Sequence, residues 1–83
     1  MYTVRITPHA QKELDGLPEQ LQIRITERAL ALEENPHPPG VKKLHGLPGF
    51  YRLRVGAYRV KYLIQDDVRI VMVVEVVHRR NAY

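Results

Sequence analysis

Residues 51–62 read YRLRVGAYRVKY, and this stretch decides the fold. Apolar and charged side chains alternate on both sides of Gly56-Ala57, and a period of two is typical of half-buried strands. Glycine in the first position of a two-residue loop fits a type II′ turn. With that turn Val55 pairs with Tyr58, so the segment is predicted to form an antiparallel hairpin.

The register of this hairpin places four cations on one face. Arg54 lies opposite Arg59 and Arg52 opposite Lys61, and like charges in that arrangement are destabilising by roughly 0.2–1 kcal/mol a pair. We interpret the cluster as a site for an anion that offsets the repulsion, because arginine grips phosphate with a planar fork. The alternative is a solvated strand face that happens to be basic, and a three-residue loop would scatter the cluster.

Working towards the N-terminus, the chain predicts a strand and two helices. Residues 2–6 alternate as a strand, and Thr7-Pro8 supplies an N-cap and a first helical residue for a short helix that stops at Gly16. A second helix opens at Pro18. Its apolar stripe comprises Leu21, Ile25, Ala29 and Leu32.

Towards the C-terminus, residues 68–77 form the most apolar segment, which predicts a central strand covered on both faces. We therefore expect a single α+β domain over residues 1–83. An N-terminal strand and a helical hairpin precede a three-stranded antiparallel meander, and the helices pack on one face of the sheet.

Charge is distributed unevenly along the 83 residues. Residues 1–40 carry four Lys and Arg against six Asp and Glu, whereas residues 41–83 carry nine against three. A basic half beside a mildly acidic half indicates a polyanion-binding face.

There is no cysteine, and the four histidines lack the spacing of a metal site, so we expect neither a metal nor a cofactor. Without an export signal or a long apolar run, the protein is expected to be soluble and cytoplasmic, with no membrane partner.

Further candidate residues lie in the loop before the hairpin and at the C-terminus. Lys42 and Lys43 are placed to reach backbone phosphates, although solvation is the alternative for each. The ending HRRNAY, residues 78–83, adds two guanidiniums, an imidazole that exchanges protons near neutral pH and a tyrosine able to stack on a base. A frayed polar terminus is the alternative. Glu75, within the last strand, is interpreted as pairing with a nearby cation or helping to position one.

Residues 43–62 resemble the RelE/ParE toxin superfamily through the pattern Leu-x-Gly-x-x-x-x-Tyr-Arg-x-Arg-x-Gly-x-Tyr-Arg, and residues 78–83 resemble its RelE branch. The resemblance implies the RelE-like microbial RNase fold and the toxin of a type II toxin–antitoxin pair. It also implies a ribosome-dependent, metal-independent endoribonuclease. Such toxins cut mRNA in the ribosomal A site by attack of a ribose 2′-hydroxyl on the adjacent phosphate.

The resemblance also assigns roles to particular positions. Arg52 and Arg54 fall where the family places basic residues on the second strand. Arg59 falls on an arginine that binds the scissile phosphate, Arg79 on a second catalytic arginine, and Tyr83 on a tyrosine that stacks on the mRNA base. Arginine does not lose its proton in proteins, which leaves Lys61 and His78 as alternative proton acceptors. Lys42, Lys43 and Arg80 are expected to bind RNA.

Partners and competing functions follow from the same resemblance. A RelB-like antitoxin is expected to order a flexible acidic segment over the basic face. Ribosome and mRNA are the expected targets, with promoter DNA bound through the antitoxin complex. A ParE-like inhibitor of DNA gyrase and a non-catalytic nucleic-acid-binding module remain alternatives. The combination of Arg59, Arg79 and Tyr83 favours a RelE-like endoribonuclease over these alternatives.

Overall fold

The structure is a computed structural model that describes residues 1–82, so the position of Tyr83 lies outside the described residues. Two helices are followed by most of a five-stranded sheet. The elements in chain order are β1 (Thr3–Ile6), α1 (Pro8–Asp15), α2 (Glu19–Leu30), the 3-10 turn η1 (Ala31–Glu33), β2 (Lys42–Lys43), β3 (Phe50–Val55), β4 (Tyr58–Gln65), β5 (Ile70–His78) and the 3-10 turn η2 (Arg79–Asn81).

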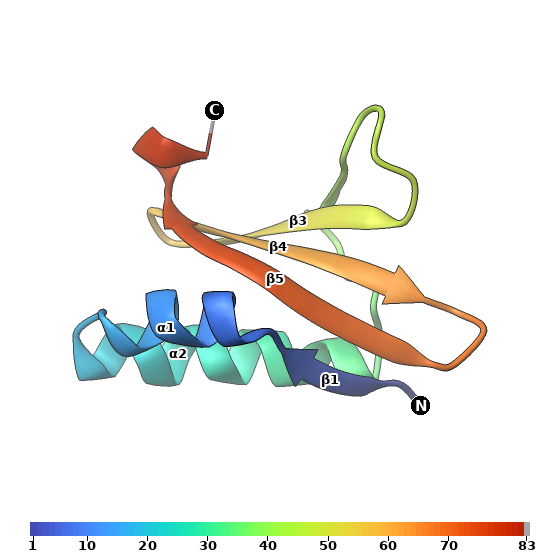
Figure 1. The fold of residues 1–83 in the computed structure, drawn as a ribbon, viewed down its shortest axis with the longest axis horizontal. Coiled ribbons are helices and arrows are strands. Elements are labelled where there is room, and N and C mark those ends of the chain that lie inside the picture. Colours follow the sequence, from blue (N-terminus) through green and yellow to red (C-terminus); the bar gives the residue numbers. More distant parts are fainter. Residues whose placement is uncertain (83) are drawn as a thin grey trace.

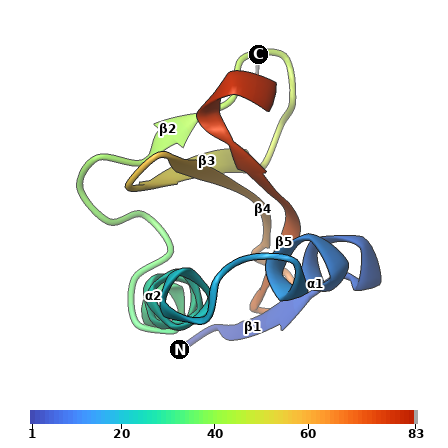
Figure 2. The ribbon, with the colours of Figure 1, turned by 90° about the vertical axis from the view of Figure 1, so that its left-hand side faces the viewer.

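The sheet is mixed, with strand order β1-β5-β4-β3-β2. The β3–β4–β5 meander is antiparallel, and β1 runs parallel to β5 at its edge. Both helices lie on one side of the sheet, whereas η2 lies on the other (Figures 1 and 2). The predicted α+β architecture is therefore confirmed. The sequence did not reveal β2, because a two-residue strand has no periodicity to detect.

Local signals set the ends of α1 as predicted, whereas α2 stops at Leu30, short of the expected end at Asn35-Pro36, and continues as η1. The Thr7 hydroxyl accepts a hydrogen bond from the Ala10 amide at 3.1 Å, and α1 ends before Gly16. On α2 the predicted apolar stripe faces the sheet. Its residues Ile25 and Ala29, together with Leu32 of η1, are buried in one core with Leu53, Val55, Val60 and Tyr62. Within residues 1–82, the helices are all too short or too polar to cross a membrane.

Strand β5 differs from the prediction in two respects. It begins at Ile70, because Arg69 adopts a left-handed φ of 56° in the preceding turn. Its burial is also one-sided, with Val71, Val73 and Val76 in the core and the other strand residues partly exposed. The expectation that both faces are covered is therefore wrong. Both helices pack on the same side of the sheet (Figure 1). The apolar residues on the other face of β5 stay half-buried.

A β-bulge explains the unequal spacing of the buried residues in β5. Tyr62 pairs with Val73 but Lys61 pairs with Glu75, so Val74 is an extra residue on this strand. Beyond the bulge the alternation is reversed. Val76 enters the core, and Glu75 faces the side of the sheet away from the helices.

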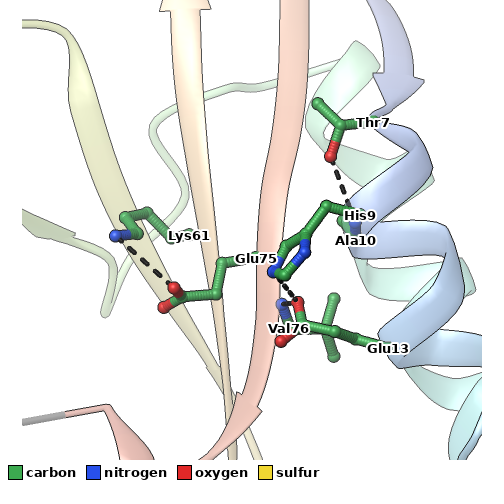
Figure 3. Close-up of polar contacts among 7 residues, drawn as sticks. All are labelled: Thr7, His9, Ala10, Glu13, Lys61, Glu75 and Val76. Carbon is green, nitrogen blue, oxygen red and sulfur yellow. Dashed lines mark hydrogen bonds and ion pairs between the residues drawn. The ribbon is translucent and has the colours of Figure 1, made fainter.

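Where β1 ends, α1 lies along the edge of β5. The last β1 pairing joins Ile6 to Val73, and the Thr7 amide then donates to the Val73 carbonyl at 3.0 Å. Further along, the Val76 amide donates to Glu13 Oε1 at 2.8 Å (Figure 3). A side chain of α1 thus replaces a strand as the acceptor.

Replacing Glu13 by alanine is expected to lower the free energy of unfolding by about 1–3 kcal/mol, because a partly buried amide loses its acceptor. Glu13→Gln retains a carbonyl oxygen at the same place and should restore most of the loss. Urea unfolding of the two variants and the wild type measures the difference. Equal stability of Glu13→Ala and the wild type would contradict this role.

Candidate active site

The hairpin has the predicted register. Val55 pairs with Tyr58 across Gly56-Ala57, and Gly56 adopts a φ of +59°, which glycine reaches at no steric cost. Arg54 lies opposite Arg59 and Arg52 opposite Lys61. Strand β2 adds a fifth cation, because Lys42 pairs with Arg52. We call the side of the sheet that carries Lys42, Arg52, Arg54, Arg59 and Lys61 the cation face.

A hollow of about 480 Å³ opens at the edge of the cation face. Strand β2 pairs only with Tyr51 and Arg52, so no strand within residues 1–82 covers the second half of β3. The residues that line this edge hollow are Arg28, Pro39, Gly40, Lys42, Arg52, Leu53, Arg54 and Arg59. Five of these described residues are cations and none is acidic, which makes the edge hollow a strongly positive site.

Arg28 is the member of this set that sequence reasoning missed. It lies in the last turn of α2, four residues after Arg24 and directly before the buried Ala29. The i, i+4 spacing of two arginines beside an apolar stripe was the available signal. The packing of α2 against β3, which the sequence does not specify, brings Arg28 to the edge hollow.

Arg59 is the buried member of the cation face, with only 7% of its surface exposed. Its Nη1 donates to the carbonyls of Gly56 at 3.3 Å and Tyr58 at 3.1 Å. Its Nε is buried and has no hydrogen-bond acceptor among residues 1–82. An unsatisfied buried donor costs about 1–3 kcal/mol, and more on a charged group. A phosphate bound in the edge hollow would supply the opposite charge.

A second, smaller hollow of about 60 Å³ lies towards β5. It is lined by Leu44, Arg52, Arg59, Lys61, Glu75 and Ala82. Lys61 Nζ lies 3.8 Å from Glu75 Oε1 (Figure 3). About a third of each of the two side chains is exposed. Ala82 follows η2, so the C-terminal segment forms part of the wall of this inner hollow.

The other candidates near the C-terminus occupy different positions. The Arg79 amide donates to the Ala57 carbonyl at 2.7 Å, which ties η2 to the hairpin turn. His78 pairs with Tyr58 and contacts its ring edge-on at 5.4 Å, so it lies on the side of the sheet opposite Lys61. The side chains of Arg79 and Arg80 are exposed and line neither hollow.

Two further predicted site residues are not placed on the cation face. Lys43 pairs with Tyr51 and therefore lies on the other side of the sheet from Lys42. It borders a separate hollow in the loop before β3. Tyr83 lies outside the described residues. Among residues 1–82, no three His, Asp or Glu side chains gather as a metal site.

Comparison with known proteins identifies the family. The model of the ParE toxin of type II toxin–antitoxin systems matches residues 4–83. The chain belongs to the RelE/ParE toxin family. Toxin RelG of Mycobacterium tuberculosis is 34% identical over 83 residues, which cover 99% of this chain and 95% of that protein. Within the family, this chain is therefore a RelE-like toxin of a type II toxin–antitoxin system.

Solved structures of RelE-like toxins share the fold. The RelE–RelB complex of the archaeon Pyrococcus horikoshii matches with a TM-score of 0.84 and 31% identity, covering 98% of each chain. The RelBE2 complex of M. tuberculosis matches with a TM-score of 0.82 and 35% identity, covering 94% of this chain and 98% of that one. Both structures contain a toxin together with its antitoxin.

Proposed function

We propose that this RelE-like toxin is a ribosome-dependent endoribonuclease that cuts mRNA in the A site without a metal. The observation that carries the proposal is the environment of Arg59. This side chain is buried, and its Nε–H has no acceptor within residues 1–82. Four other cations line the same edge hollow. A charged phosphorane is the species that such preorganised donors stabilise best.

The reaction is attack of a ribose 2′-hydroxyl on the adjacent phosphate. Arg59, Arg52 and Arg54 hold the scissile phosphate, and Arg79 acts as a second catalytic arginine. Lys42, Lys43 and Arg80 contact the RNA backbone, and Tyr83 stacks on a base of the codon. The ribosome contributes by holding the codon near in-line geometry, so free mRNA is expected to be a poor substrate. Of the two proton acceptors that the sequence leaves open, Lys61 shares the cation face and His78 does not.

The partner proposed for this toxin is a cognate RelB-like antitoxin. Relatives with the same fold are found in complexes of toxin and antitoxin. An acidic segment of the antitoxin would neutralise the five cations of the edge hollow and exclude RNA from it. We place the toxin in the cytoplasm, where ribosomes are, and expect the pair to bind promoter DNA through the antitoxin.

The proposal is tested with purified toxin on programmed ribosomes with an empty A site and on the same mRNA alone. Cleavage within the A-site codon, with little cleavage of free mRNA, is the expected result. A folded toxin that cuts neither substrate would contradict the proposal. Inhibition of gyrase supercoiling would then support the ParE-like alternative, and RNA binding without either activity would support a binding module.

Arg28 provides a separate test of the edge hollow. Arg28→Gln is expected to weaken binding of a single-stranded RNA oligonucleotide similarly for all sequences, with a salt slope shallower by about 0.7 for the lost phosphate contact. Fluorescence anisotropy at several salt concentrations measures the slope. Arg5→Gln, an exposed residue of β1 that lines neither hollow, is the matched control. Identical slopes for the two variants would exclude Arg28 from RNA binding.

A further inference from the structure

The proposed chemistry needs a proton acceptor on the cation face, and few side chains there have a lone pair. The three arginines stay charged at any physiological pH. Lys42 lies on the outer strand β2 and lines the edge hollow but not the inner hollow. Lys61 is paired with Glu75, and the ammonium form that makes this pair has no lone pair to offer. His78 lies on the opposite side of the sheet, and its Nδ1 already accepts the Arg80 amide at 3.2 Å.

Among the described residues Glu75 remains, and the bulge in β5 is what brings it to the cation face. Val71 and Val73 point into the core, so unbroken alternation would send residue 75 into the core as well. The extra residue Val74 reverses the alternation, and Glu75 pairs across the strands with Lys61. Bulges that re-aim one side chain are over-represented next to active sites. Figure 3 shows the Glu75 side chain extending towards Lys61 and away from α1.

The surroundings of Glu75 suit proton transfer at a phosphate. Among the described residues that line the inner hollow, Glu75 is the one carboxylate, and it shares this hollow with Arg52 and Arg59. The ion pair with Lys61, in which about a third of each side chain is exposed, adds little to stability and is a weak structural reason for a bulge in this strand. Proton transfer at a bound phosphate is a stronger reason for a carboxylate beside the phosphate-binding arginines.

We propose that Glu75 accepts the proton of the attacking 2′-hydroxyl and that Lys61 protonates the leaving oxygen. This inference rests on the endoribonuclease function proposed above. As the O2′–P bond forms, the 2′-hydroxyl proton passes to the Glu75 carboxylate. As the P–O5′ bond breaks, the Lys61 ammonium gives a proton to O5′. The products are a 2′,3′-cyclic phosphate and a 5′-hydroxyl. Glu75 then returns its proton to the Lys61 amine across the 3.8 Å pair, and both residues regain their starting forms.

The pH dependence follows from the groups that face Glu75. Lys61 and Arg59 from β4 and Arg52 from β3 line the inner hollow with Glu75. Arg79 and Arg80 of η2 follow the same strand but do not line this hollow. The arginines do not titrate, so the acid limb of the pH–rate profile on ribosomes is assigned to the Glu75 carboxylate. Removing that carboxylate should therefore flatten the acid limb as well as lower the rate.

The test compares single-turnover cleavage of ribosome-bound mRNA by the wild type, Glu75→Gln and Glu75→Asp. We expect Glu75→Gln to lose about 10²- to 10⁴-fold in rate and its acid limb, with ribosome binding and thermal stability close to wild type. Glu75→Asp should regain part of the rate together with the acid limb. Glu27→Gln, which changes an exposed carboxylate of α2, is the matched control.

Three results would overturn the inference, and they are distinguishable. If the wild type cuts and Glu75→Gln cuts at a rate within about threefold of it, Glu75 is not the proton acceptor and the endoribonuclease function stands. If the wild type itself does not cut, the proposed function fails and the role of Glu75 fails with it. A Glu75→Gln variant that is slow but keeps the wild-type pH profile would assign Glu75 a structural role only.

Discussion

Arg59→Met is expected to slow cleavage of ribosome-bound mRNA by about 10²- to 10³-fold while leaving the toxin at least as stable as the wild type. The loss of rate follows from removing the guanidinium aimed at the phosphate. Arg59→Met loses the two hydrogen bonds that Nη1 donates to the Gly56 and Tyr58 carbonyls, and two gains in stability offset this loss. The substitution removes the unsatisfied buried Nε–H, and it relieves the repulsion between Arg59 and Arg54 directly opposite. Methionine keeps most of the aliphatic stem that packs in this buried position.

Single-turnover cleavage and urea unfolding of the same preparations check both halves of this prediction. Arg5→Met removes a cation from exposed β1 and serves as the control for net charge. A strongly destabilised Arg59→Met would show that the guanidinium holds the hairpin together rather than serving an anion. Full activity in a stable variant would remove Arg59 from the site.

Tyr62→Ala is expected to reduce the free energy of unfolding by about 3–5 kcal/mol, a large share of the stability of a domain this small. Tyr62 is fully buried beneath the cation face and is the largest such side chain among the described residues. Its ring stacks on Tyr51 at 5.9 Å, and its hydroxyl donates to the Pro36 carbonyl at 2.8 Å. Denaturant unfolding should show a loss of only about 1 kcal/mol for Tyr62→Phe, which keeps the ring. Equal losses for both variants would contradict this account.

The burial of Tyr62 also predicts that the folded protein loses stability at alkaline pH. Burial, with a smaller contribution from Tyr51, raises the pKa of Tyr62 from 10.0 to about 12 in the folded protein. The folded state holds the Tyr62 proton more tightly than the unfolded state does. The contribution of this proton to the free energy of unfolding is therefore complete below pH 10. It is lost as the pH rises from 10 to 12 and amounts to about 2–3 kcal/mol. The stability difference between wild type and Tyr62→Phe should therefore shrink or reverse over this window, and a constant difference would contradict the assignment.

The parts that could be predicted from the sequence are those set by local patterns. Alternation around Gly56 gave the register that places Arg52, Arg54, Arg59 and Lys61 on one face, and capping residues gave the ends of α1. Alternation in the sequence assigns each side chain to one side of the sheet, but it does not say how deeply that side chain is buried. The burial of Arg59 therefore became visible only in the structure, where its side chain folds back on the carbonyls of the turn.

The features that escaped prediction depend on tertiary packing or on an uninformative pattern. The run at residues 70–74 is apolar throughout, so it contains no alternation whose break could reveal a bulge at Val74. The side of the sheet that Glu75 faces was consequently undetermined. Arg28 joins the site only because α2 packs against β3, and the sequence does not state that packing.

The chemical ends of the cleaved mRNA test the central claim most directly. A ribosome-bound mRNA is cut by the toxin, and the termini at the A-site cleavage are identified. A parallel mRNA carries a single 2′-deoxynucleotide on the 5′ side of the cut. The account predicts a 2′,3′-cyclic phosphate and a 5′-hydroxyl, with no cleavage of the 2′-deoxy mRNA. A 3′-hydroxyl with a 5′-phosphate, or cleavage of the 2′-deoxy mRNA, would contradict attack by the ribose at the cation face.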